Sequence, residues 1–135
     1  MDNLTVGIAE YKIVKAPNTI TTFGLGSCCG VVLYDEINKV AGLVHILLSD
    51  SKTETNLKNK AKYADTGIVE LYQEMGKYGA NRRFIKAKLA GGAHMFNFGK
   101  STSSIFSVGE RNVKACKETL NKLKVKTIGK GEKFI

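Results

Sequence analysis

The first third of the chain holds five short apolar stretches rich in β-branched and aromatic residues, and this spacing limits the possible folds. Runs of this length and composition predict β-strands. The five stretches are Thr5–Ile8, Tyr11–Val14, Ile20–Leu25, Cys28–Tyr34 and Val40–Leu48. The polar segment Asp35–Asn38 lies between the last two and predicts a hairpin turn, so these two strands are expected to be antiparallel neighbours.

Two later segments have the spacing of amphipathic helices. One runs from about Lys62 to Tyr78 and is ended by Gly79, and the other is Glu110–Leu123. Three more strands are predicted at Arg83–Ala90, Ser104–Val108 and Lys124–Ile128. Because strands and helices do not alternate regularly, the sequence predicts an α/β fold in which a mixed β-sheet or sandwich is flanked by helices.

The composition is that of an ordinary globular domain and disfavours several functions. The 135 residues contain neither an apolar run that could span a membrane nor a typical secretory signal, so we expect a cytoplasmic protein without membrane insertion. With three cysteines, we expect free thiols. The formal net charge is +9. The lysines are scattered among acids without interleaved aromatic residues, which favours an acidic protein partner over nucleic acid.

The segment TFGLGSCCG at residues 22–30 is the densest motif in the chain. Gly24 and Gly26 permit a sharp turn that leaves backbone amides open to a ligand. Nucleotide binding is disfavoured, because GxxxxGK[ST] is absent and Cys29 stands where GxGxxG requires its last glycine. A metal site is disfavoured by the lack of a CxxC pair, and we expect no cofactor.

A catalytic cysteine fits this motif better. A thiol between a glycine turn and a strand can meet a substrate, with backbone amides nearby to stabilise an oxyanion. Side chains alternate between the faces of a strand, so only one of the adjacent cysteines can face the site. Cys28 is closer to the turn and is the better candidate, which leaves Cys29 for the core. Cys116 lies on the apolar stripe of the second predicted helix and is also expected in the core.

A histidine is the expected base, because imidazole titrates near neutral pH. A hairpin at Asp35–Asn38 places His45 almost opposite Cys28, and Cβ atoms of such cross-strand pairs lie within roughly 5.5 Å. The other histidine, His94, follows a double glycine and has no such relation to the thiol. A third group is expected to orient the imidazole. The candidates are Thr22, which is nearest, Ser49 and Asp50.

Six segments in order form a specific combination of motifs. They are TFGLGSC (Thr22–Cys28), VVLYD (Val31–Asp35), GLVHILLSDS (Gly42–Ser51), KYAD (Lys62–Asp65), AGGAHMF (Ala90–Phe96) and VGERNV (Val108–Val113). This combination resembles the CheD family, the chemoreceptor glutamine deamidases of bacterial chemotaxis. The resemblance spans nearly the whole chain. It departs from the family at Cys29, where a small aliphatic residue is common, and near Ser49, where a proline is usual.

The resemblance implies an α/β fold similar to the catalytic domain of cytotoxic necrotizing factor toxins. Residues 1–135 are expected to form one such domain, as a short member of the family or one trimmed at its C-terminus. It further implies a catalytic set of Cys28, His45 and Thr22. The implied substrates are glutamines on methyl-accepting chemotaxis receptors, and the implied partner is the CheC phosphatase of the CheY response regulator.

We expect Cys28 to form a thioester with the glutamine, while Gly26 and Ser27 hold the oxyanion. Residues expected to border the site and contact the substrate are Ser49, Asp50, Gly91, Gly92 and Phe96. Two other functions stay open. The chain can be a binding module for CheC and receptor helices with little or no catalysis, or a cysteine amidase or protease with another substrate.

Overall fold

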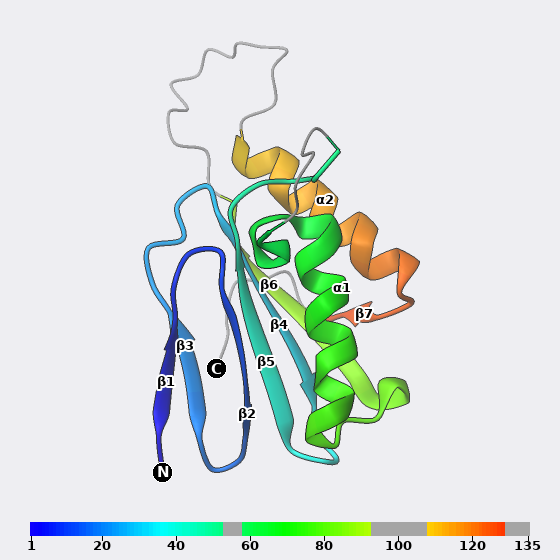
Figure 1. The fold of residues 1–135 in the computed structure, drawn as a ribbon. Coiled ribbons are helices and arrows are strands. Elements are labelled where there is room, and N and C mark those ends of the chain that lie inside the picture. The colour runs from blue at the N-terminus through cyan, green and yellow to red at the C-terminus, as the bar shows by residue number, and fades with distance from the viewer. Residues whose placement is uncertain (53–57, 93–107, 129–135) are drawn as a thin grey trace.

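The computed structural model describes residues 1–52, 58–92 and 108–128, and its main feature is a mixed five-stranded sheet (Figure 1). Its strands lie in the order β2 (Tyr11–Lys15), β5 (Val40–Ile46), β4 (Cys29–Asp35), β6 (Ile85–Gly91) and β7 (Lys126–Thr127). Neighbours are antiparallel except β6 and β7. A second sheet pairs β1 (Asn3–Val6) with β3 (Thr19–Thr22) in parallel. The predicted mixed α/β fold is confirmed.

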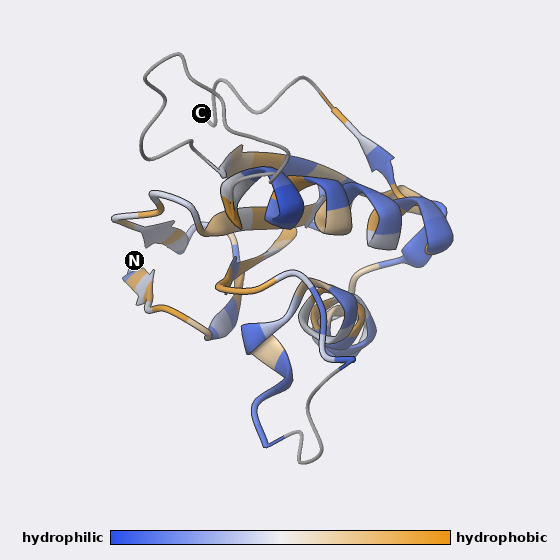
Figure 2. Ribbon diagram, turned by 90° about the horizontal axis from the view of Figure 1, so that it is seen from above, coloured by the Kyte–Doolittle hydropathy of each residue, from blue (hydrophilic) through white to orange (hydrophobic). Residues whose placement is uncertain are grey.

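Two helices, α1 (Ala64–Met75) and α2 (Val108–Lys122), cover one face of the larger sheet (Figure 1). Hydrophilic and hydrophobic residues alternate along both helices, as helices with one buried side require (Figure 2). Helix α1 lies so close to β5 that a Cβ on Gly42 would be 2.6 Å from the Leu71 side chain. The core beneath the helices includes Cys29, Val31, Leu33, Val44, Ile46, Ile68, Leu71, Cys116 and Leu120.

The first predicted helix is divided into three parts. Short 3₁₀ helices η1 (Lys60–Lys62) and η2 (Gly76–Tyr78) flank α1, and Gly79 ends the segment in the left-handed region at φ 98°, as predicted. A further 3₁₀ turn, η3 (Arg82–Phe84), precedes β6.

Some predicted strand boundaries are wrong. Strand β3 ends at Thr22 rather than at Leu25, because Gly24 turns the chain with φ 64°. Strand β1 ends at Val6, two residues before the predicted end. The strand predicted for residues 104–108 is wrong at Val108, which lies in α2. Residues 104–107 lie outside the described residues.

The hairpin between β4 and β5 forms as predicted, but its register is shifted. Asp35 is the last residue of β4 and pairs with Val40, so the turn is centred one residue later than predicted. Every cross-strand pair is therefore offset by two residues, and Gly30, not Cys28, lies opposite His45. Cys28 itself precedes the first residue of β4.

The face of the larger sheet opposite the helices is partly covered by β3. A cavity of about 620 Å³ lies between the two. It is lined by Ile20, Thr21, Thr22, Leu25, Gly30, Val32, Tyr34, Glu36, Ala41, Leu43, Lys88 and Ala90. Gly30 and Thr22 line its end nearest to His45, so the cavity adjoins the predicted site. Within residues 1–52, 58–92 and 108–128, no helix is long and apolar enough to cross a membrane.

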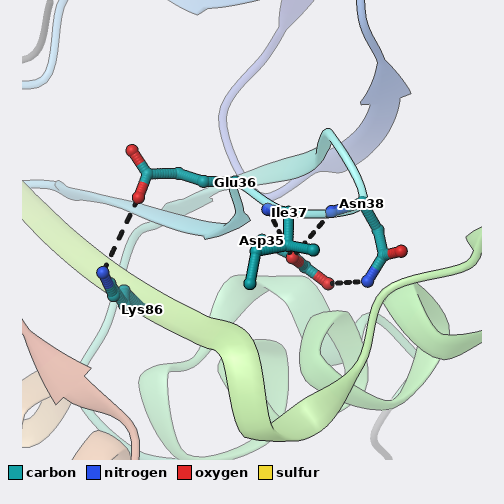
Figure 3. A network of polar contacts seen from close by, with 5 residues as sticks. All are labelled: Asp35, Glu36, Ile37, Asn38 and Lys86. Atoms are coloured by element: carbon teal, nitrogen blue, oxygen red, sulfur yellow. Dashed lines mark hydrogen bonds and ion pairs between the residues drawn. The ribbon is translucent and has the colours of Figure 1, made fainter.

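The β4–β5 hairpin is fixed by a buried carboxylate at its turn (Figure 3). Asp35 is 1% exposed and accepts hydrogen bonds from the amides of Ile37, Asn38 and Asn81 and from Asn38 Nδ2, at 2.8–3.0 Å. Burial raises the pKa of Asp35, but the hydrogen bonds outweigh it and hold the pKa below its ordinary value of 3.8. The ionised carboxylate thus ties the turn to the segment before β6.

We predict that Asp35→Asn lowers the free energy of unfolding at pH 7 by roughly 1–3 kcal/mol, because an amide cannot accept all four hydrogen bonds. A folded carboxyl pKa below 3.8 contributes stability above that pH and loses it as the pH falls through the folded value. The difference from wild type should therefore shrink below pH 3.8, as measured by urea unfolding.

The matched control is Glu36→Gln, one residue along. Its carboxylate is 71% exposed and lies 3.6 Å from Lys86 Nζ, so its loss should change the free energy of unfolding by less than about 0.5 kcal/mol. Equal stability of Asp35→Asn and wild type at pH 7 would contradict the role given to this carboxylate.

Candidate functional site

The central contact of the site joins a hydroxyl to an imidazole. Thr22 Oγ1 lies 2.9 Å from His45 Nδ1 and 2.7 Å from the Val6 carbonyl oxygen. A hydroxyl has one proton, and the carbonyl can only accept, so Thr22 donates to Val6. His45 Nδ1 must then carry the proton of the neutral ring and donate to Thr22. This leaves the lone pair of the imidazole on Nε2.

The His45 side chain is held in a nearly closed space. Its exposed fraction is 1%, and within the described part of the chain Nε2 has no hydrogen-bond partner. Its backbone is fixed on both sides, by Gly30 of β4 and by hydrogen bonds with Ala9 and Glu10. Gly30 lies opposite His45, and the Leu25 side chain fills the space on this face of the sheet, 3.3 Å from where a Cβ on Gly30 would lie.

The turn that carries the thiol is built as the glycines predict. Gly24 and Gly26 have φ values of 64° and 50°, and the Cys28 amide donates to the Leu25 carbonyl at 2.6 Å. The Cys28 amide is thus engaged and is a poor oxyanion donor. Among the described residues, the amides of Gly26 and Ser27 donate no hydrogen bond.

The double glycine at the end of β6 holds the carbonyl of Cys28. The Gly92 amide donates to it at 2.8 Å, and Gly91 packs so close that a Cβ would lie 2.3 Å from the same oxygen. Gly91 and Gly92 also have φ values of 89° and 71°, which disfavour other residues. These two predicted substrate contacts therefore lie beside the thiol and shape its turn.

Burial shifts both titrating groups toward their neutral forms. Burial, followed by the neighbouring Cys29, raises the pKa of the Cys28 thiol above its ordinary value of 9.0. Burial lowers the pKa of His45 below 6.5. The resting pair is therefore a thiol and a neutral imidazole, not a thiolate–imidazolium ion pair.

The other candidate residues lie away from this contact. Ser49 and Asp50 follow β5, and no described hydrogen bond joins either of them to Thr22, Cys28 or His45; Asp50 instead accepts from the Lys52 amide. Phe96 and His94 lie outside the described residues. The thiols of Cys29 and Cys116 are fully buried and hydrogen-bonded to each other, so both are core residues as predicted.

One polar contact of the site was not predicted. Asn112 of α2 donates through Nδ2 to the carbonyls of Ser27 at 2.9 Å and Leu47 at 3.0 Å. Asn112 is four residues before Cys116, on the buried side of the helix, and an asparagine on an apolar stripe is the signal that identifies it. The sequence pattern alone assigns no role to its motif, VGERNV.

No metal site accompanies these residues in the described part of the chain, where no group of three or more suitable side chains is found. The site is that of a small mixed α/β protein in which a hydroxyl is hydrogen-bonded to an imidazole near the end of a strand. Among the described residues, no hydrogen bond joins the Cys28 thiol to His45 Nε2.

Comparison with known proteins identifies the family. The family model described as CheD chemotactic sensory transduction matches residues 47–131. A probable chemoreceptor glutamine deamidase CheD of Caldanaerobacter subterraneus subsp. tengcongensis is 56% identical over 120 residues, covering 89% of this chain and 74% of the relative. The protein so named from Lachnoclostridium phytofermentans is 51% identical over 122 residues, covering 90% and 75%.

The chemoreceptor glutamine deamidase CheD of Halalkalibacterium halodurans is 47% identical over 125 residues, covering 92% of this chain and 76% of the relative. With a family model over more than half of the chain and relatives of this similarity, the chain belongs to the CheD family.

We predict that the neutral imidazole of His45 carries its proton on Nδ1, because Thr22 can only accept from it. Nitrogen chemical shifts of labelled histidine should show this tautomer at pH 7. A lowered base pKa keeps the ring neutral as the pH falls, so its titration midpoint should lie below 6.5.

Thr22→Val should lose the tautomer preference, whereas the matched control Thr21→Val should keep it, since Thr21 Oγ1 donates to Asn3 on the exposed side. An Nε2-protonated ring in the wild type would contradict the assignment.

Proposed function

We propose that this protein deamidates glutamine side chains of methyl-accepting chemotaxis receptors, with Cys28 as nucleophile, His45 as base and Thr22 as the group that orients the base. The relatives described above are named chemoreceptor glutamine deamidases, which supports the substrate class. The observation that carries the chemistry is the Thr22–His45 hydrogen bond, because it leaves an unpartnered basic nitrogen on the same side of the sheet as the nucleophile turn.

In the first half of the reaction, His45 Nε2 takes the proton of the Cys28 thiol as sulfur attacks the carboxamide carbon. The tetrahedral intermediate collapses when the imidazolium returns this proton to the departing nitrogen. The C–N bond breaks, ammonia leaves, and a thioester remains.

In the second half, His45 takes a proton from water, whose oxygen attacks the thioester carbon. The C–S bond breaks and the proton passes to sulfur, so the resting thiol is restored. The substrate is left with a glutamate carboxylate. No cofactor is required, since no electrons are exchanged with a third group.

The oxyanion of both intermediates requires donors beside the thiol. The amides of Gly26 and Ser27 fit this task, because the left-handed turn at Gly26 frees them from strand pairing. The Ser27 hydroxyl is a third candidate donor.

The direction of the pKa shifts favours general-base catalysis over a stored thiolate. A raised thiol pKa and a lowered imidazole pKa keep the proton on sulfur until the substrate arrives. A neutral thiol reacts slowly with alkylating agents in general. It becomes reactive when a carboxamide is positioned beside it and the base removes its proton.

Two exposed apolar side chains follow the paired ends of β1 and β3, and we propose that partners approach near them. Phe23 directly follows Thr22 and is 72% exposed, and Ile8 lies two residues after Val6 and is 58% exposed. The chain as a whole carries a formal net charge of +9, which suits acidic helical partners. We propose that receptor helices and the CheC phosphatase bind here. A protein that binds both without catalysis is the alternative.

We predict that Cys28→Ala abolishes ammonia release from a purified receptor cytoplasmic fragment, a loss of more than roughly 1,000-fold. Cys29→Ala, the matched control, should retain activity, because its thiol lies in the core. Peptide mass mapping should locate the gain of glutamate at single glutamines. Turnover by Cys28→Ala would exclude the mechanism, and binding without turnover by the wild type would favour the alternative.

We predict that Phe23→Ser raises KM for the receptor fragment about tenfold with little change in kcat, because an exposed apolar anchor contributes to binding and not to the reacting atoms. Ile37→Ser is the matched control, since Ile37 is 64% exposed in the turn at the other end of β4 and β5. A KM unchanged in Phe23→Ser would place the binding surface elsewhere.

A further inference from the structure

A single side-chain amide connects the two segments that carry the thiol and the imidazole. Asn112 is 1% exposed, and its Nδ2 donates to the carbonyls of Ser27 and Leu47 at 2.9 and 3.0 Å. Ser27 directly precedes Cys28, and Leu47 is two residues after His45. The orientation of the amide follows from its partners, because two carbonyl oxygens can only accept and the nitrogen supplies both protons.

This contact lies where the sheet no longer holds the two segments together. The β4–β5 ladder ends at the pair Cys29 and Ile46, so Cys28 and Leu47 are beyond its last hydrogen bonds. The amide group of Asn112 bridges that gap and takes the place of one more rung. It therefore limits how far the thiol can move relative to the end of β5.

A packing role alone does not account for these contacts. Asn112 Oδ1 is buried and has no hydrogen-bond partner among the described residues, which is unfavourable for stability. An apolar residue would fill the same space without that cost. The other buried polar residue of α2, Thr119, bonds only to the carbonyl of Ala115 in its own helix and connects no segments.

We propose that Asn112 is a positioning residue that sets the distance between the Cys28 thiol and the His45 imidazole. It touches neither the substrate nor the reacting atoms. The catalytic consequence rests on the proposed function, but the coupling between thiol and imidazole is measurable without a substrate.

The test is a double-mutant cycle on the alkylation rate of Cys28 by iodoacetamide at pH 7, followed by peptide mass mapping. The proteins are wild type, His45→Ala, Asn112→Ala and the double variant. In the wild-type background, His45→Ala should slow alkylation about tenfold or more, because it removes the base. In the Asn112→Ala background the same change should have almost no effect, because the pair is already out of position.

Two variants guard against loss of folding. Asn112→Ser supplies one hydroxyl proton, which can bind one of the two carbonyls. In this background His45→Ala should slow the alkylation of Cys28 by a factor between those of the wild-type and Asn112→Ala backgrounds. Thr119→Val perturbs the same helix and should leave the wild-type effect unchanged. Circular dichroism melts establish that each protein is folded at the assay temperature, and if Asn112→Ala is not, Asn112→Ser decides.

An equal effect of His45→Ala with and without Asn112 would overturn the proposal, as would the same loss of coupling in Thr119→Val. No effect of His45→Ala in the wild type would also overturn it, because there would be no pair to position. With a receptor fragment, Asn112→Ala should lower kcat about 100-fold with KM unchanged. If the wild type couples Cys28 to His45 yet releases no ammonia, the proposed function fails and the positioning role stands.

Discussion

The site depends on which acceptor receives the one hydrogen bond that the Thr22 hydroxyl can donate. The Val6 carbonyl receives it, so the hydroxyl oxygen can only accept from His45 Nδ1, and the basic lone pair of the ring is left on Nε2. This chain of donors and acceptors explains the small parallel sheet. Pairing β1 with β3 puts Val6 beside Thr22, and β3 then lies over the face of the larger sheet on which His45 stands. Two strands that contribute little to the helix-covered core thereby decide which nitrogen of the His45 ring carries the proton.

Burial of both reactive groups gives the site a neutral resting state. The same desolvation that raises the pKa of Cys28 lowers that of His45, because each charged form has lost its water. Transfer of the proton from the thiol to the imidazole creates two charges in a site that has little water to stabilise them. A substrate whose carboxamide binds at the turn must therefore supply polar groups that stabilise these charges. Selectivity then comes from docking as well as from the thiol. This agrees with the contrast between His45, which is nearly closed off, and Phe23, which is exposed one residue after Thr22.

The sequence predicts the elements of this fold better than their register. Alternation and helical spacing locate both helices and all seven strands of the described residues, but the sequence places Asp35 in the turn because aspartate favours turns. In the structure its carboxylate is buried and caps the turn from the last position of β4. That single residue moves every cross-strand pair by two, so Gly30 takes the place predicted for Cys28. Thr22 was singled out by its neighbourhood and by the family resemblance. Its acceptor, the Val6 carbonyl, is a backbone atom and leaves no signal in the sequence.

Backbone carbonyls are the common feature of the contacts that hold the segments of Cys28 and His45. Thr22, Asn112 and Gly92 each bind a main-chain oxygen, and Gly91 is pressed against one. The oxygens belong to Val6, Ser27, Leu47 and Cys28. A carbonyl is present whatever its side chain, so the residues that supply these oxygens are free to change within the limits of packing. The residues that bind these oxygens are not free to change in the same way. Each of these positions requires a particular group, which is a hydroxyl, a primary amide or a glycine. The chemistry of the site is therefore encoded in few side chains, spread over segments far apart in the sequence, and the fold brings them to the same end of β5.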